Sequence, residues 1–221
     1  MALQFPEGFM EAARDYSWML SRHYPQKSSL KLVGDKFMLS KALRQVLYRG
    51  ICAPERARER QQKLGMPGKG ERILVDGYNV LFTVNNYLLG KHVFIGNDGC
   101  LRDAGEMRGR IVNKPVFSRS IGLLLDVLAL WEGNTYIIYL DEPIPFSGRL
   151  SIELSKDMVQ MGIEGEALCV ASADHWLKKD QSDAVATSDS VIMDQYSGKV
   201  IDIPRYILEL SFEAEIPALQ L

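Results

Sequence analysis

The sequence predicts an α/β protein with a mainly parallel sheet, preceded by a small basic helical domain. After residue 72, short runs of β-forming residues alternate with amphipathic helical stretches, whereas before it only helical periodicity is visible. Strands that alternate with helices are joined by right-handed crossovers, which place helices on both faces of a parallel sheet. Three glycines and a proline within residues 64–70 mark the boundary between the two regions, because such a segment cannot continue a helix.

The composition indicates a soluble globular protein. The 221 residues are 47% hydrophobic and 24% charged, which argues against disorder and against a coiled coil. No apolar run reaches the roughly 18 residues of a membrane span, and the first ten residues lack the pattern of a secretory signal. The three cysteines have no close pair, and so favour neither a disulfide framework nor a zinc site. We therefore expect a cytoplasmic protein without a membrane partner.

The region before the glycine-rich break is predicted to be helical. Apolar residues recur at helical spacing between Ala12 and Leu20, Ser40 can cap a second helix, and Pro54 suits the first turn of a third. The predicted division of the chain is a basic helical domain at 1–66, a linker at 67–72 and an α/β domain at 73–221.

The charges are distributed unevenly along the chain. Residues 1–72 contain 14 Lys and Arg against 7 Asp and Glu, and the remaining residues contain 12 against 21. A basic region beside an acidic one indicates either a module that binds a polyanion or two domains that attract each other. Arg56, Arg60 and Lys63 share one face of the third predicted helix. We interpret this face either as an RNA contact or as an ordinary solvated surface.

The elements expected after residue 72 alternate in type, and Ser147 is expected to cap one of the helices. In order, they are a strand at 72–75, a helix at 118–132, a strand at 135–140, a helix at 147–161, a strand at 167–171, a helix at 174–179, a strand at 184–187, a helix ending at 196, a strand at 199–203 and a helix from 204. Residues 85–113 contain five glycines and little periodicity, and no structure is assigned to them. A segment of that length without periodicity is usually functional or mobile.

An aspartate follows each of the first four predicted strands. These residues are Asp76, Asp141, Asp174 and Asp189. Ligands of an open parallel sheet bind beyond the carboxyl ends of its strands, so we expect the four carboxylates to gather at one edge. Asp183 precedes its strand and is therefore expected at the opposite edge, in a structural role.

Gathered carboxylates repel one another unless a cation lies between them. Mg²⁺ and Mn²⁺ prefer oxygen ligands, and Mg²⁺ keeps waters that it can share with a phosphate. We therefore predict a Mg²⁺ or Mn²⁺ site formed by Asp76, Asp141, Asp174 and Asp189, which could activate water for attack on a phosphodiester. The alternative is structural: Asp174 and Asp189 can cap helices, and Asp141 can begin a turn. Asp76 is harder to explain in that way, because it directly follows an apolar strand.

Two motifs resemble those of PIN-like nuclease domains. Residues Asp76-Gly-Tyr-Asn79 resemble the first motif of these domains, and Thr187-Ser-Asp189 resembles the motif near their last acid. Together with the basic helical N-terminus, the chain resembles a prokaryotic family known as domain of unknown function 434, followed by a PIN-like domain. The resemblance implies a PIN-like α/β/α sandwich and divalent-metal-dependent cleavage of single-stranded RNA or structured nucleic acid.

The same resemblance implies roles for individual residues. Asp76 would be the central metal ligand with Asn79 beside it, and Asp174 and Asp189 would be further acids. Many PIN domains place their second acid in a helix, so Asp103 and Glu106 are alternatives to Asp141. The candidate substrate contacts are Asn79, Arg102, Arg108, Arg56, Arg60 and Lys63.

The predicted function is therefore a divalent-metal-dependent nuclease that acts on RNA, with the four aspartates as its catalytic residues. Two alternatives remain open: a non-catalytic RNA- or ribosome-binding protein on the same fold, and a protein-interaction module. An intact acidic set at the sheet edge favours the nuclease over both alternatives.

Overall fold

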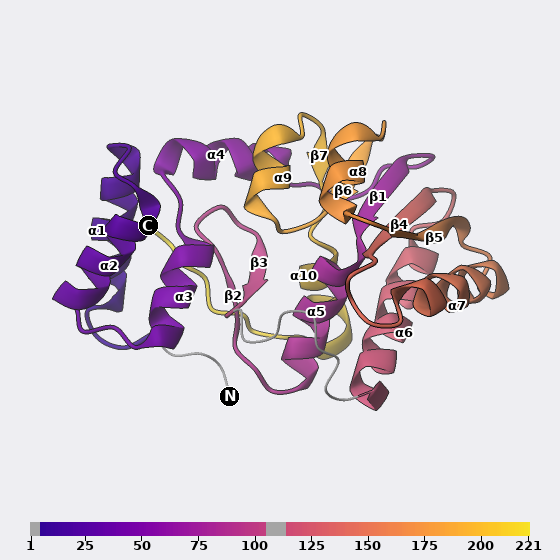
Figure 1. Cartoon of the computed structure of the whole chain (residues 1–221), viewed down its shortest axis with the longest axis horizontal. Coiled ribbons are helices and arrows are strands. Elements are labelled where there is room, and N and C mark those ends of the chain that lie inside the picture. Colours follow the sequence, from indigo (N-terminus) through magenta and orange to yellow (C-terminus); the bar gives the residue numbers. More distant parts are fainter. Residues whose placement is uncertain (1–4, 105–113) are drawn as a thin grey trace. The chain divides into compact units, whose positions relative to one another are not determined.

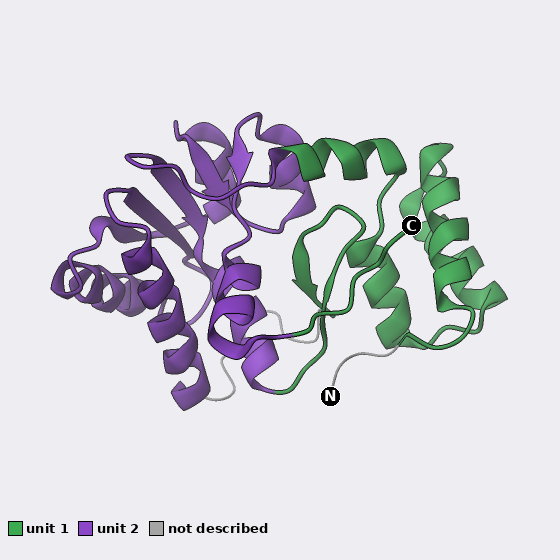
Figure 2. Cartoon of the chain, turned by 180° about the vertical axis from the view of Figure 1, so that it is seen from behind, with its two compact units in different colours: residues 1–62, 90–106, 215–221 green, residues 63–89, 107–214 purple. Residues whose placement is uncertain are grey.

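The computed structural model describes residues 5–104 and 114–221. Its described residues fall into two compact units, each built from segments that are distant in the sequence (Figure 2). The first unit comprises residues 1–62, 90–106 and 215–221, and the second comprises 63–89 and 107–214. The predicted helical domain thus shares a unit with two later segments, and a single boundary near residue 67 does not describe how the chain packs.

Four helices supply most of the first unit. Ser40 caps the third of them, as the sequence predicts: its Oγ accepts a hydrogen bond of 3.3 Å from the N–H of Leu43. The second helix was not expected, because its burial is confined to Ser29, Val33 and Gly34 and its apolar periodicity is weak. The helices are α1 (Phe9–Ser21), α2 (Gln26–Lys36), α3 (Lys41–Gly50) and α4 (Pro54–Lys63).

A hairpin and the C-terminal segment complete the core of the first unit. Strands β2 (Val93–Ile95) and β3 (Leu101–Asp103) are antiparallel, and Ile95 forms a further bridge with Ala218. Phe94 and Leu219 are buried in the same cluster as the apolar residues of α1 and α3. A Cβ atom at position 50 would lie 2.4 Å from the ring of Phe94, which explains why α3 ends in glycine. Part of the unassigned segment 85–113 is therefore structural.

The second unit contains a five-stranded sheet in which every neighbouring pair is parallel (Figure 1). The strand order is β5-β4-β1-β6-β7, which confirms the predicted parallel sheet. The strands are β1 (Arg72–Asp76), β4 (Thr135–Asp141), β5 (Glu164–Val170), β6 (Ala184–Ala186) and β7 (Lys199–Val200). The chain leaves β1 toward β4 on one side and returns to β6 on the other. This reversal beside β1 is the place where an open α/β sheet binds its ligands.

Among the described residues of the second unit, six helices accompany the sheet, in an α/β architecture. Helices α5, α6 and α10 pack against one another, α7 packs on β5, and α8 packs on β1 and β4 beside α9. They are α5 (Gly77–Leu88), α6 (Lys114–Leu130), α7 (Ser147–Gln160), α8 (Ala173–Lys179), α9 (Ser190–Gln195) and α10 (Ile203–Phe212). None of the helices described here is long and apolar enough to cross a membrane.

Three departures from the expected elements have physical causes. Helix α5 was missed because it is buried on most of its surface and rich in Asn and β-branched residues, which weakens both periodicity and helix propensity. The last strand ends at Val200 because Asp202 accepts a bond from the N–H of Arg205 and starts α10. Residue Ser147 does not cap α7: the residue before the helix is Phe146, in a left-handed conformation.

Candidate functional site

The carboxylate of Asp76 lies at the carboxyl end of the central strand and is 6% exposed. Helix α5 begins at the very next residue, Gly77. A Cβ atom on Gly77 would lie 2.8 Å from the carbonyl oxygen of Tyr139 and 2.7 Å from the side chain of Leu140. Glycine at this position therefore lets α5 start directly against β4, which leaves Asp76 at the edge of the sheet.

Two sequence motifs meet at this edge, one after β1 and one after β6. The Thr187 hydroxyl donates a hydrogen bond of 2.8 Å to Oδ2 of Asp76 and accepts one of 3.1 Å from the N–H of Asp189. The Oδ1 atom of Asn79 accepts bonds of 3.0 Å from both the N–H and the hydroxyl of Ser188. The motifs Asp76–Asn79 and Thr187–Asp189 thus form one hydrogen-bonded constellation beside the topological reversal.

The electrostatics of Asp76 are those of a buried carboxylate without a counter-ion. Burial is the main cause that raises its pKa to about 7, and the negative charges of Asp174 and Asp189 raise it further. Hydrogen bonds from Thr187 and from the N–H of Asn79 act in the opposite direction. In the part of the chain that the structure describes, no Lys or Arg forms an ion pair with Asp76. A cation at this position would remove the penalty.

The other three predicted acids lie close enough to influence one another. The pKa of Asp174, in the first turn of α8, is raised by partial desolvation and by the charges of Asp189 and Asp141. Asp141 ends β4, and its Oδ1 accepts a bond of 2.8 Å from the N–H of Ala173. Asp189 caps α9 through Oδ1, which accepts from two backbone N–H groups. The structure therefore brings all four aspartates to one edge, as the topology predicts, although Asp141 and Asp189 also hold helix starts.

The fit of a divalent cation can be judged from these residues. Among residues 5–104 and 114–221, no three His, Cys, Asp or Glu side chains are placed to surround a metal ion by themselves. Mg²⁺ often takes only one or two carboxylates and completes its shell with water and substrate phosphate. Asp76, buried and unpaired between like charges, fits such an open site, with Asp174 and Asp189 as its neighbours.

The predicted basic face of α4 does not exist as one surface. Arg60 is 6% exposed and forms an ion pair of 2.9 Å with Asp98. Lys63 donates bonds of 2.7 Å to two backbone carbonyls, those of Met193 and Tyr196. Of the three cations, Arg56 alone has an exposed side chain. The charge pattern of the helix could not show that Arg60 and Lys63 bind residues far along the chain.

The segment around residue 103 also has a structural role. Arg102 is 2% exposed and grips both oxygens of Asp98, at 2.5 and 2.8 Å. Asp103, an alternative for the second acid, forms a 2.7 Å ion pair with Arg49 inside the first unit, whereas the four aspartates belong to the second. Arg102 is thus a buried structural cation, and Asp103 is paired with a cation of its own unit. Glu106 and Arg108 lie outside the described residues.

Two residues that contact the site were not predicted to do so from the sequence: Tyr78 and Ser147. The Ser147 Oγ lies 2.7 Å from the carbonyl oxygen of Asp141 and 2.6 Å from that of Ile144, and Tyr78 Oη lies 2.6 Å from it. A serine hydroxyl has one hydrogen, so Tyr78 must donate when Ser147 donates to a carbonyl. The tyrosine of the first motif thereby fixes the loop that follows Asp141. Its position between Asp76 and Asn79 was the available signal.

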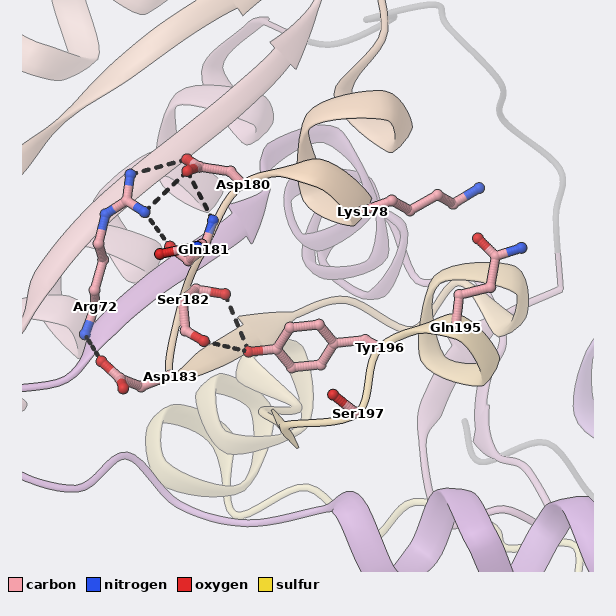
Figure 3. A pocket seen from close by; sticks show the side chains of 9 residues that line it. All are labelled: Arg72, Lys178, Asp180, Gln181, Ser182, Asp183, Gln195, Tyr196 and Ser197. Atoms are coloured by element: carbon pink, nitrogen blue, oxygen red, sulfur yellow. Dashed lines mark hydrogen bonds and ion pairs between the residues drawn. The ribbon is translucent and has the colours of Figure 1, made fainter.

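A hollow of the second unit lies at the opposite edge, where the strands begin (Figure 3). It has a volume of 740 Å³. The guanidinium of Arg72 there contacts both carboxylate oxygens of Asp180, at 3.0 and 2.8 Å. Asp183 accepts a bond of 2.8 Å from the N–H of Arg72, in agreement with its predicted structural role. The charges of this hollow thus neutralise one another, in contrast to the aspartate edge.

Comparisons with known proteins place the chain in a family. The model described as "Domain of unknown function (DUF5616)" matches residues 67–206, and the model described as "Protein of unknown function (DUF434)" matches residues 9–63. An uncharacterized protein of Methanocaldococcus jannaschii is 30% identical over 206 residues, which cover 92% of this chain and 95% of that protein. No solved structure matches the chain. With a matching model over most of its length, the chain belongs to the DUF5616 family and carries a DUF434 segment before that domain.

Proposed function

We propose that this protein is a divalent-metal-dependent nuclease of the PIN-like type, which hydrolyses phosphodiester bonds of RNA at the carboxyl edge of its sheet. One observation carries the proposal. Asp76 is a buried carboxylate with a pKa raised to about 7, and it lies beside Asp174 and Asp189 at the topological reversal of the sheet. Perturbed carboxylates at such a position are typical of functional sites.

The residues of this edge would divide the work. Asp76 would hold Mg²⁺ or Mn²⁺ by giving up the proton that burial favours, while Thr187 keeps its Oδ2 in place. Asp174 and Asp189 would supply further carboxylate oxygens, and Asp141 would fix the start of α8. When bound, the cation would supply Lewis acidity and a water activated for attack on phosphorus. Asn79 would position the loop after β6 rather than contact the substrate through Oδ1.

A second candidate is an RNA-binding protein without catalytic activity. It is favoured by the absence, within the described residues, of three carboxylates already arranged around one point. Such a protein would bind RNA with or without Mg²⁺ and would leave it intact. The two candidates therefore differ in one measurable property, the dependence of cleavage on the metal and on Asp76.

The decisive experiment measures cleavage of a fluorescent single-stranded RNA with Mn²⁺ and with EDTA. Wild type is compared with Asp76→Asn and with Asp126→Asn, an equivalent change at an exposed position of α6. We expect cleavage by wild type and Asp126→Asn in Mn²⁺ only, and a loss of at least about a hundredfold in Asp76→Asn, since even indirect metal partners contribute ten- to a hundredfold. Cleavage that survives in Asp76→Asn would contradict the proposal. RNA binding by wild type without cleavage would favour the second candidate.

A further inference from the structure

A mainly apolar groove of 480 Å³ lies beside the aspartate edge, within the second unit. It runs between the start of α6 and the connection from β4 to α7, and both of these ends are at the carboxyl edge of the sheet. Its apolar walls include Phe117, Ile144 and Phe146, and its charged residues are the cations Lys114 and Arg149 and the acid Glu153. The volume is that of a pocket for a small ligand or one part of a larger one.

The backbone of Phe146 is held in a conformation that packing does not explain. Its φ is 71°, in the left-handed region that bulky residues rarely adopt. Its side chain is 75% exposed, so the strain is not offset by burial of the ring. Strained residues of this kind concentrate at ligand sites. The chain therefore presents an aromatic ring to solvent at a conformational cost.

The groove and the carboxylates share one loop. The connection that carries Phe146 begins at Asp141, and the N–H of Ile144 donates a 3.2 Å bond to the carbonyl of Asp141. Ser147 closes the loop through its contacts with the same carbonyl and with Tyr78, a member of the motif that contains Asp76. A molecule bound along this edge would therefore meet the groove immediately next to the carboxylates.

We propose that this groove binds an unpaired nucleobase of the RNA strand, with the ring of Phe146 as the stacking surface and with Lys114 and Arg149 near the phosphates. The inference rests on the proposed function, and it makes single-stranded RNA the substrate. Aromatic rings combined with cations are the chemistry by which proteins hold unpaired bases. Among the described residues, Arg149 forms an exposed pair with Glu153, at 2.7 Å, and a phosphate can displace such a weak partner.

A paired base could not use this groove, because its faces are already covered by its neighbours in the duplex. An apolar peptide would fit the walls, but it would offer no anionic group to Lys114 or to Arg149, whose exposed partner is Glu153. The same groove on a second copy of the chain offers the same positive charges, so it would not be complementary. Charge and shape together therefore favour an unpaired nucleotide over either protein partner.

The test measures binding of a fluorescent ten-nucleotide oligouridine by anisotropy, with the full chain in an Asp76→Asn background that prevents cleavage. Phe146→Leu keeps an exposed apolar side chain but cannot stack, whereas Phe146→Tyr retains the ring. We expect Phe146→Leu to weaken binding about tenfold, with Phe146→Tyr close to the parent. The same RNA annealed to its complement should bind all three proteins alike, and their melting temperatures should agree.

The outcomes separate the groove from the nuclease. Binding that is unchanged in Phe146→Leu, or absent in the parent, overturns the groove inference even if the Asp76-dependent cleavage is real. Binding that depends on Phe146, with no Mn²⁺-dependent cleavage by the wild-type chain, supports the groove and overturns the nuclease. Self-association that is lost in Phe146→Leu, measured by sedimentation without RNA, would identify the groove as a contact between copies and overturn the inference.

Discussion

Asp76 links the stability of the chain to its proposed chemistry. Its pKa is about 7 in the folded protein and 3.8 ordinarily, so the folded state binds a proton more tightly than the unfolded state does. Protonation therefore stabilises the folded protein fully below about pH 4, and this stabilisation is lost as the pH rises toward 7. Above that pH the folded chain contains a buried, charged carboxylate unless a cation neutralises it.

The first prediction follows from this loss of stability with rising pH. In a chelating buffer, Asp76→Asn should unfold with a free energy higher than that of wild type at pH 8, on the order of a few kcal/mol. Near pH 4 the two proteins should be nearly equal, because both then have a neutral side chain that can accept the Thr187 bond. Urea titrations at both values measure the difference. A difference that does not vary with pH would show that Asp76 titrates normally.

The metal should reverse the order of stability of wild type and Asp76→Asn. At pH 8, Mn²⁺ should stabilise wild type by mass action on the folded state and leave Asp76→Asn almost unchanged. Thermal melts of both proteins over a range of Mn²⁺ concentrations measure this effect. Equal shifts in the two proteins, or no shift in either, would mean that Asp76 does not hold the cation, whatever the pKa of its carboxyl.

The acids could be predicted from sequence, but their hydrogen-bond partners could not. Asp76 and Asp189 follow apolar strands, so a parallel sheet alone brings them to one edge. The bond from Thr187 to Asp76 depends on β6 lying next to β1, and strand order is not visible in a strand–helix alternation. The contact between Tyr78 and Ser147 depends in the same way on how α5 and α7 meet.

At the scale of elements, helix α4 and the hairpin form a buried ionic cluster. Asp98, in the turn between β2 and β3, receives bonds from Arg60 of α4 and from Arg102 of β3. The sequence of this helix is mostly charged, which left two interpretations open, an RNA contact or an ordinary solvated surface. The pattern of charges in the helix shows which of its faces are polar. Whether Arg60 is buried depends instead on Asp98, an acid that lies far along the chain. The sequence Asn97-Asp-Gly99 is typical of a hairpin turn. The strands on either side have only three residues each, too few to show an alternating pattern.

The third prediction concerns this cluster. Asp98→Asn removes the negative charge that both arginines contact, and should lower the free energy of unfolding by about 3–5 kcal/mol. Glu55→Gln is the matched control, because Glu55 forms an exposed pair of 3.7 Å with Arg58 and its loss should change stability by less than about 1 kcal/mol. Urea titration measures both. A small effect at Asp98 would show that the arginines find other partners without loss.

At the scale of the whole molecule, the chain passes between its two units more than once. Residues 90–104 and 215–221 pack with the N-terminal helices, although they follow the start of the sheet in sequence. Local composition could locate the glycine-rich segment 64–70, yet it could not show that Phe94 and Leu219 belong to the earlier core. The order of the strands in the sheet could not be predicted from the sequence either. The alternation of strands and helices was enough to predict that the strands are parallel.

The last prediction tests this discontinuous arrangement. A specific protease site inserted between Gly68 and Lys69, which are both exposed, would give fragments 1–68 and 69–221. The first unit draws its core from both fragments, and the N–H of Gly65 also donates a 3.0 Å bond to Val200. The nicked protein should therefore elute as one particle in gel filtration and separate only in denaturant. A folded fragment 1–68 that elutes alone would show instead that the N-terminal helices form an independent domain, since their core would then need neither Phe94 nor Leu219.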